Sequence, residues 1–186
     1  ALNRNVNQID TIIIKLYLEG TKISNIFDNY IDVCLGKIQD LLDDKKISIA
    51  EEHIARKTIS KSLHNIRSSI SKTPNNNKST LCLNLENDIP DLSIDMIQII
   101  LEELGYNVHN AGSNTSILNL PLLLEKNNFS SLYIYMCDRQ CCSATVITNI
   151  NKTVKDLDAI ADLCEKYKIS LFIGGPGTKF IDQKIS

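Results

Sequence analysis

Tryptophan is absent from this chain of 186 residues, and aromatic residues make up only 5% of it. The hydrophobic cores must therefore be built mainly from isoleucine and leucine. No apolar run approaches the roughly 20 residues that a membrane-spanning helix needs. The polar start also lacks the apolar run and small-residue cleavage site of a signal peptide. With 43% hydrophobic and 23% charged residues, the composition predicts a folded cytoplasmic protein.

Neither sign of charge is in large excess, since the chain has 20 Lys and Arg residues and 22 Asp and Glu residues. No basic stripe is visible, and contacts with phosphate groups need clustered basic side chains. We therefore expect no direct contact between this chain and nucleic acid. The first residue is Ala1 rather than Met, which is typical of a fragment of a longer protein. Any contact with DNA would then come from a domain N-terminal to Ala1.

Paired CxxC spacings of the zinc-binding type are also missing. In a chain of this size without an export signal, reduced thiols are the expected state. Cys137, Cys141 and Cys142 form the one cluster of cysteines, and we expect an apolar or loop role for it rather than a metal or redox role. The sequence therefore predicts neither a disulfide framework nor a zinc site.

The first half of the chain has the apolar periodicity of amphipathic helices. The predicted helices cover residues 6–18, 24–42 and 49–71. Ser48 and Glu51 have the spacing of a capping box at the start of the last of these helices. We expect residues 1–72 to form a four-helix bundle, followed by a polar, asparagine-rich linker over residues 73–79.

The second half alternates between short apolar strands and helices. The predicted strands cover residues 80–85, 106–109, 132–136 and 169–173, and the predicted helices cover residues 92–104, 116–126 and 154–167. This alternation predicts a flavodoxin-like, Rossmann-type domain over residues 80–186, with a five-stranded parallel sheet. Ligands of such sheets bind beyond the carboxyl ends of the strands. The candidate binding loops are therefore residues 86–91, 110–115, 137–143 and 174–179.

A helical bundle, a short linker and a flavodoxin-like domain together resemble the two-part cobalamin (B12)-binding module. That module occurs in corrinoid methyl-transfer proteins, methionine synthase and light-responsive repressors of the MerR type. In the bundle, residues 18–20, 26–30 and 47–53 are similar to the repressor branch, with Ile47-Ser-Ile-Ala-Glu-Glu-His53 as the most specific stretch. In the second domain the resemblance rests on residues 101–108, Gly112 and residues 173–175.

The resemblance implies a set of corrin-binding residues. Glu52 and His53 correspond to residues on the upper face of the corrin, and His53 would be an upper ligand of the cobalt ion. Gly174 and Gly175 correspond to a glycine pair that lets the backbone approach the nucleotide tail. The cofactor-binding residues implied in this way are Leu42, Glu52, His53, Asp88, Asp138, Gly174 and Gly175.

Several positions depart from the family pattern. Pro90 stands where the family places the histidine that ligates cobalt from below, and Ser93 stands where it places a glycine. Leu42 stands where a tryptophan covers the corrin, and Asp43 where the light-sensing branch can carry a histidine. The Ser-x-Thr that contacts the nucleotide tail is replaced by residues 136–138, which include Asp138. We therefore expect the chain to bind cobalamin without a histidine as the lower ligand of the cobalt ion.

Each of these residues also has a simpler interpretation. His53 could be an ordinary surface histidine, Glu52 could lie on a solvated helix face, and Asp88 could cap the helix that begins near Leu92. Gly174 and Gly175 could simply form a tight turn.

Two functional hypotheses follow. The first is a sensory module of a transcriptional or signalling regulator, not an enzyme, that binds cobalamin or a related tetrapyrrole and changes its self-association or its contacts with a regulatory partner. The second is a degenerate module that has lost the cofactor and serves as a protein–protein interaction or dimerisation domain. A methyl-carrier role ranks third, because Pro90 has no atom that could ligate cobalt.

Overall fold

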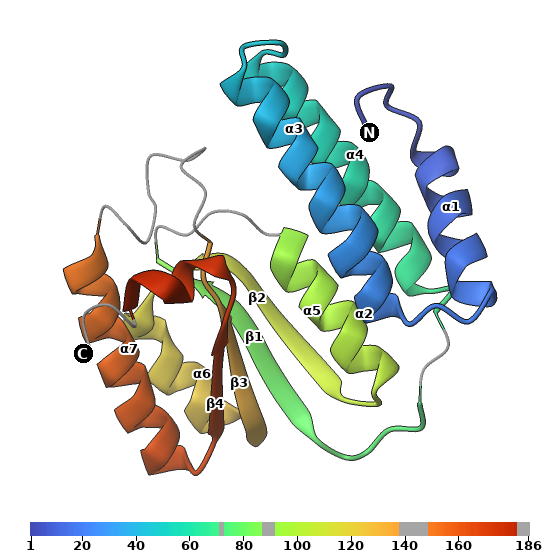
Figure 1. The fold of residues 1–186 in the computed structure, drawn as a ribbon. Coiled ribbons are helices and arrows are strands. Elements are labelled where there is room, and N and C mark those ends of the chain that lie inside the picture. Colours follow the sequence, from blue (N-terminus) through green and yellow to red (C-terminus); the bar gives the residue numbers. More distant parts are fainter. Residues whose placement is uncertain (71–72, 87–91, 138–148, 182–186) are drawn as a thin grey trace. The chain divides into compact units, whose positions relative to one another are not determined.

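The computed structural model describes residues 1–70, 73–86, 92–137 and 149–181, and Figure 1 shows the elements along the chain. The chain divides into two compact units, Ala1–Ser71 and Lys72–Ser186. None of the helices in the described ranges has the length and apolarity that crossing a membrane requires.

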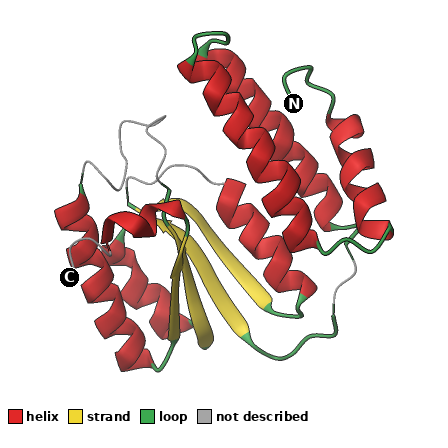
Figure 2. Ribbon diagram, viewed as in Figure 1, coloured by secondary structure: helices red, strands yellow, loops and turns green. Residues whose placement is uncertain are grey.

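The first unit is built from helices alone (Figure 2). Its elements are α1 (Val6–Leu18), α2 (Ile23–Ile26), the π-helical segment η1 (Phe27–Asp32), α3 (Val33–Asp43) and α4 (Ile49–Arg67). Ile26 and Asp32 have right-handed helical backbone angles, so α2, η1 and α3 follow one another without a break. The three predicted helical ranges are therefore present, and the range predicted over residues 24–42 is one continuous rod made of α2, η1 and α3.

The core of the bundle consists almost entirely of isoleucine and leucine, as the absence of tryptophan requires. Its buried apolar side chains are Ile13, Ile23, Ile26, Phe27, Ile31, Leu35, Ile38, Ala55, Ile59, Leu63 and Ile66. A polar contact between helices accompanies this core: Asp10 on α1 accepts hydrogen bonds from Ser62 and Asn65 on α4, the latter at 2.9 Å. Because both helices contribute, this contact fixes how α1 and α4 lie against each other.

The second unit is a parallel sheet with helices on both faces (Figures 1 and 2). Its elements are β1 (Ser79–Leu85), α5 (Leu92–Glu103), β2 (Asn107–Thr115), the short 3-10 helix η2 (Ile117–Asn119), α6 (Leu120–Lys126), β3 (Phe129–Tyr135), α7 (Ile150–Tyr167), β4 (Ser170–Gly174) and the 3-10 turn η3 (Pro176–Thr178). The strand order is β2-β1-β3-β4 and every pair is parallel. This order matches the first four strands of a flavodoxin-like sheet. The predicted fold class is confirmed, with four strands rather than five in the described residues.

The two faces of the sheet differ in chemistry. One face carries Leu81, Leu83, Leu132 and Ile134, which pack against buried side chains of α6 and α7. On the other face, Ser131 Oγ donates to Thr80 Oγ1 at 2.8 Å inside a fully buried polar pair. Alternation along the strands thus places an apolar face against two helices and a mixed face on the side of α5.

The mixed face changes in character from β1 to β4. Near α5, burial raises the pKa of the Cys82 thiol to about 12, helped by the negative charges of Asp95 and Glu102. Toward the sheet edge, the Tyr133 and Phe172 rings stack with centroids 4.7 Å apart. Phe172 is 48% exposed there. The sheet therefore ends in a stacked aromatic pair on β3 and β4, in which Tyr133 is partly buried and Phe172 is exposed.

The prediction that residues 110–115 form a loop is wrong. These residues continue β2 to its end, where Thr115 pairs with Leu85 of β1. The ladder is irregular here, and Gly112 has a φ of 72°, which favours glycine. Asn110 supports the irregular backbone, because its Oδ1 accepts a hydrogen bond from Gly112 N at 2.7 Å. A polar, glycine-containing strand of this kind has the composition of a loop.

The linker predicted at residues 73–79 is tied to the second unit where it is described. Thr73 N donates to the carbonyl oxygen of Glu103 at 2.9 Å, and Asn76 N donates to that of Gly105 at 3.0 Å. A Cβ on Gly105 would lie 2.5 Å from the carbonyl oxygen of Pro74. The segment thus packs closely on the end of α5.

Candidate functional site

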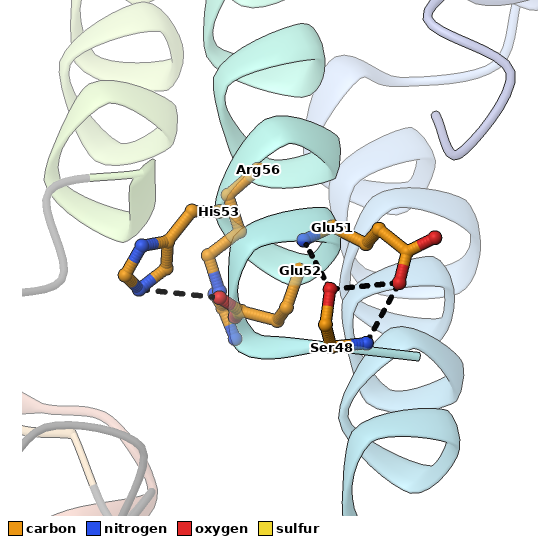
Figure 3. Close-up of polar contacts among 5 residues, drawn as sticks. All are labelled: Ser48, Glu51, Glu52, His53 and Arg56. Atoms are coloured by element: carbon orange, nitrogen blue, oxygen red, sulfur yellow. Dashed lines mark hydrogen bonds and ion pairs between the residues drawn. The ribbon is translucent and has the colours of Figure 1, made fainter. Parts of the chain in front are cut away.

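The candidate site in the first unit lies on the first two turns of α4 (Figure 3). Ser48 is the N-cap, and it exchanges hydrogen bonds with Glu51 as the sequence predicts. The bonds from Ser48 hold the pKa of the Glu51 carboxyl below its usual value. This capping box fixes where the helix begins, and so fixes which sides of the helix Glu52 and His53 occupy.

Glu52 is buried, with only 1% of its surface exposed, although its neighbours Glu51 and His53 are exposed. Its Oε1 accepts a hydrogen bond and ion pair from Arg56 Nε, one helical turn further along. A buried carboxylate is costly unless it is paired and hydrogen-bonded. Arg56 supplies that pairing, so the simpler interpretation of Glu52 as a solvated charge is wrong.

His53 lies beside Glu52 with its ring largely in solvent. Its side chain is 67% exposed, and its Nε2 lies 3.6 Å from Glu52 Oε2 (Figure 3). Because Nε2 is the nitrogen that faces the carboxylate, Nδ1 is the ring nitrogen left for a ligand. A histidine whose second nitrogen faces a carboxylate is the usual arrangement of a metal-ligating histidine.

Arg56 is the residue that sequence reasoning missed. Its side chain is 18% exposed. Its Nη2 is buried and has no hydrogen-bond partner. The available signal was the spacing of Glu52 and Arg56, because an acidic and a basic residue four positions apart lie on one face of a helix.

Leu42 and Asp43 lie at the end of α3, before the turn that leads to α4. Leu42 is partly buried, while Asp43 is exposed and accepts a hydrogen bond from Gln39 Nε2 at 2.9 Å. Leu42 is an apolar side chain at the position where the resemblance implies a corrin-covering residue. Asp43 is already paired within its own helix.

In the second unit, Gly174 and Gly175 connect β4 to η3 and have different structural roles. Gly175 has a φ of 96°, and a Cβ there would lie 2.5 Å from the carbonyl oxygen of Met136. A Cβ on Gly177 would lie 2.8 Å from the carbonyl oxygen of Cys137. A Cβ on Gly174 would meet nothing within 4 Å. Packing against the end of β3 thus accounts for Gly175 and Gly177, and leaves Gly174 as the glycine with open space beside it.

Lys152, near the start of α7, is paired with carboxylates close to it. Lys152 Nζ donates to Glu86 at 2.8 Å and to Asp156 at 2.7 Å, and these hydrogen bonds raise the pKa of the Lys152 ammonium group. This cluster offers no excess positive charge to a ligand, because its one cation has two carboxylate partners.

The structure thus brings Glu52 together with His53, and Gly174 together with Gly175, in two different units. Asp88 and Asp138, together with Pro90, lie outside the described residues, as do Cys141 and Cys142. Of the cysteines in the described ranges, none forms a disulfide.

The donor set of the first unit suits a metal that brings most of its own ligands. Within the part of the chain that the structure describes, no three His, Cys, Asp or Glu side chains are grouped to hold a metal ion. A cobalt ion held by a corrin would need only one donor from the protein. One accessible imidazole nitrogen beside a fixed carboxylate fits that requirement.

The fold is similar to that of a solved corrinoid protein, whereas no family model and no curated protein matches the sequence. The monomethylamine corrinoid protein of Methanosarcina barkeri aligns over 98% of this chain and 84% of its own, with a TM-score of 0.71 and 14% identity. At such low identity the likeness shows the fold alone.

Two weaker matches are a cobalamin-binding protein from Desulfitobacterium hafniense and the methanol:cobalamin methyltransferase complex of Methanosarcina barkeri. The first has a TM-score of 0.42 and 11% identity, covering 94% of this chain and 79% of that one. The second has a TM-score of 0.44 and 14% identity, covering 98% of this chain and 67% of that one. The likeness to MerR-type repressors rests on the sequence motif of residues 47–53 alone.

Proposed function

We propose that this chain is a corrinoid-binding regulatory module. It binds cobalamin or a related tetrapyrrole without a histidine lower ligand and acts as the signal-receiving part of a larger cytoplasmic regulator. The observation that carries the proposal is the buried Glu52 carboxylate, paired with Arg56 and lying beside the exposed His53. Such a charged arrangement is costly for stability and useful for holding a ligating imidazole.

In this proposal the residues of each unit have their own roles. In the first unit, His53 Nδ1 would donate to the cobalt ion and Leu42 would cover part of the ring. In the second unit, Gly174 would let the backbone approach the nucleotide tail. Asp88 and Asp138 are included from the sequence resemblance. The bound group would supply a cobalt ion able to change its ligands.

The role is regulatory rather than catalytic. Pro90 cannot ligate cobalt, whereas a methyl carrier needs controlled ligation on both sides of the metal. A bound ligand can shift the population only between states that it contacts differently. The expected output is therefore a change in self-association or in contact with a regulatory protein partner.

The degenerate module remains a second candidate, and one observation favours it. The positive φ of Gly175 and the close packing of Gly175 and Gly177 on β3 explain these glycines without any ligand. If the remaining site residues were equally explained by packing, the chain would be a constitutive interaction or dimerisation domain.

Equilibrium dialysis and absorption spectra test the proposal. The purified chain is incubated in the dark with hydroxocobalamin, adenosylcobalamin, haem and a bilin, each at about 100 μM, which reveals binding with a free energy of about −5 kcal/mol or more favourable. Uptake of cobalamin that falls for His53→Ala and not for Lys57→Met supports the proposal, because Lys57 is an exposed cation on the same helix. Absence of any uptake leaves the interaction domain as the better account.

Light scattering with and without the bound ligand, in the dark and after illumination, tests the regulatory part. A change in mass or in radius on binding supports a sensor. Cobalamin uptake with no change in either quantity would show a binding module that does not signal through self-association.

A further inference from the structure

We infer that Arg56 is a positioning residue that acts through Glu52 to hold His53 with Nδ1 directed to the ligand. The inference rests on the proposed function, and it adds a residue that the family resemblance does not include. Two consecutive contacts carry it, Arg56 with Glu52 and Glu52 with His53.

The first contact fixes the carboxylate. Arg56 Nε pairs with Glu52 Oε1, and the side chain of Glu52 is only 2% exposed. The two residues lie one turn apart on α4, so the helix itself sets their spacing. Without Arg56 the carboxylate would be buried without its charged partner, and rotation of the side chain would relieve that cost. Its second oxygen would then no longer be held toward His53.

The second contact orients the imidazole. Glu52 Oε2 lies 3.6 Å from His53 Nε2, so a small movement of the exposed ring gives a direct hydrogen bond. A carboxylate accepts this bond only from a protonated Nε2. The neutral ring then carries its lone pair on Nδ1, which becomes the ligating atom.

The surroundings of Arg56 indicate that its polar role is directed to Glu52. Its Nη2 is buried without a hydrogen-bond partner, so the guanidinium group is not satisfied on all sides as the centre of a stabilising network would be. Loss of a carboxylate partner that orients a metal-bound histidine typically lowers metal affinity about 10–100-fold. We expect a loss of that size when Arg56 is replaced, although Arg56 itself does not contact the metal.

The experiment uses diaquocobinamide, a corrinoid without the nucleotide tail whose base could compete for the axial position. Absorption titration measures its affinity and the spectral change caused by imidazole ligation. For Arg56→Met we expect a loss of about 10–100-fold in affinity, and for Arg56→Lys a partial recovery. Lys57→Met removes the same charge from the next residue of the helix, and it should bind as the unmodified chain does.

A double-mutant cycle separates positioning from general structural damage. In the background of His53→Ala, Arg56→Met should have little further effect, because the residue through which it acts is already gone. Glu52→Gln, which keeps the shape without the charge, should reproduce the loss if Arg56→Met proves poorly folded by circular dichroism.

Two results overturn the inference in distinguishable ways. If cobinamide binds and Arg56→Met equals Lys57→Met, or lowers affinity equally with and without His53, Arg56 does not position the histidine and the proposed function still stands. If the unmodified chain takes up neither cobinamide nor cobalamin, the proposed function itself fails, and the inference fails with it.

Discussion

The charged cluster on α4 and the glycine turn after β4 were both marked by the same family resemblance, and the structure treats them differently. The cluster buries the Glu52 carboxylate between exposed neighbours and pairs it with the partly buried Arg56. The turn places Gly175 and Gly177 where any side chain would strike the end of β3. Packing alone explains Gly175 and Gly177, whereas it does not explain the cluster. A motif residue is thus better evidence for a ligand when the fold would be more stable without it.

The largest expected effect concerns the cluster. Arg56→Met should lower the free energy of unfolding by about 3 kcal/mol, because it leaves a buried carboxylate without its partner. The double variant Glu52→Gln/Arg56→Met should lie within about 1 kcal/mol of the unmodified chain, since the charge is then removed with its partner. Urea denaturation followed by circular dichroism measures both values. If both variants lose the same free energy of unfolding, the charged cluster does not destabilise the fold.

Gly175→Ala tests whether packing accounts for the glycine turn after β4. A Cβ 2.5 Å from the Met136 carbonyl oxygen, together with a φ of 96°, should cost about 2 kcal/mol of unfolding free energy. Gly174→Ala is the matched control, because a Cβ there meets nothing within 4 Å. If both variants are equally stable, packing does not explain Gly175, and this result would favour a ligand-binding role for it.

Asp10→Ala gives a reference for an ordinary structural contact in the bundle. It removes the acceptor of hydrogen bonds from Ser62 and Asn65, and should lower stability by about 1 kcal/mol. Binding of cobinamide should remain unchanged. A loss of ligand affinity in this variant would mean that any weakening of the bundle lowers binding, and would remove the contrast with Arg56→Met.

The smallest effect is the pH dependence of the capping box. The pKa of Glu51 is lowered in the folded chain, so its contribution is present above the usual carboxyl pKa of 4.5 and disappears as pH falls through the lower folded value. Ser48→Ala should therefore flatten the acid side of the stability curve measured by thermal unfolding below about pH 4.5. An unchanged acid slope would show that Ser48 does not set the ionisation of Glu51.

Periodicity predicted the elements that bury a continuous apolar face. The helices of the bundle and strands such as β1 and β3 lie within a few residues of their predicted bounds. The end of β2 was missed because its residues 110–115 are polar, and because its pairing with β1 is a tertiary contact that composition does not record. The π-helical segment was missed for a related reason, since the apolar pattern continues through it.

The candidate site was predictable only in part. The Ser48 capping box and the pair Glu52–His53 follow from sequence spacing and resemblance. The burial of Glu52 does not, because a charged residue on a helix is usually solvated and only packing reveals the exception. Arg56 could have been found from its spacing to Glu52, but an acid–base pair four residues apart is so common on exposed helices that the spacing alone carries little weight.

The π-helical segment η1 is the part of the rod formed by α2, η1 and α3 where the loss of one residue would disturb the core least. Its i to i+5 hydrogen bonds take up one residue more per turn than an α-helix does. Removing a single residue between Phe27 and Asp32 could restore regular α-helix, whereas the same deletion elsewhere in the rod would turn all later side chains by about 100°. Buried positions such as Leu35 and Ile38 would then leave the core. Single-residue gaps between this chain and others of the same fold should therefore collect in this one turn.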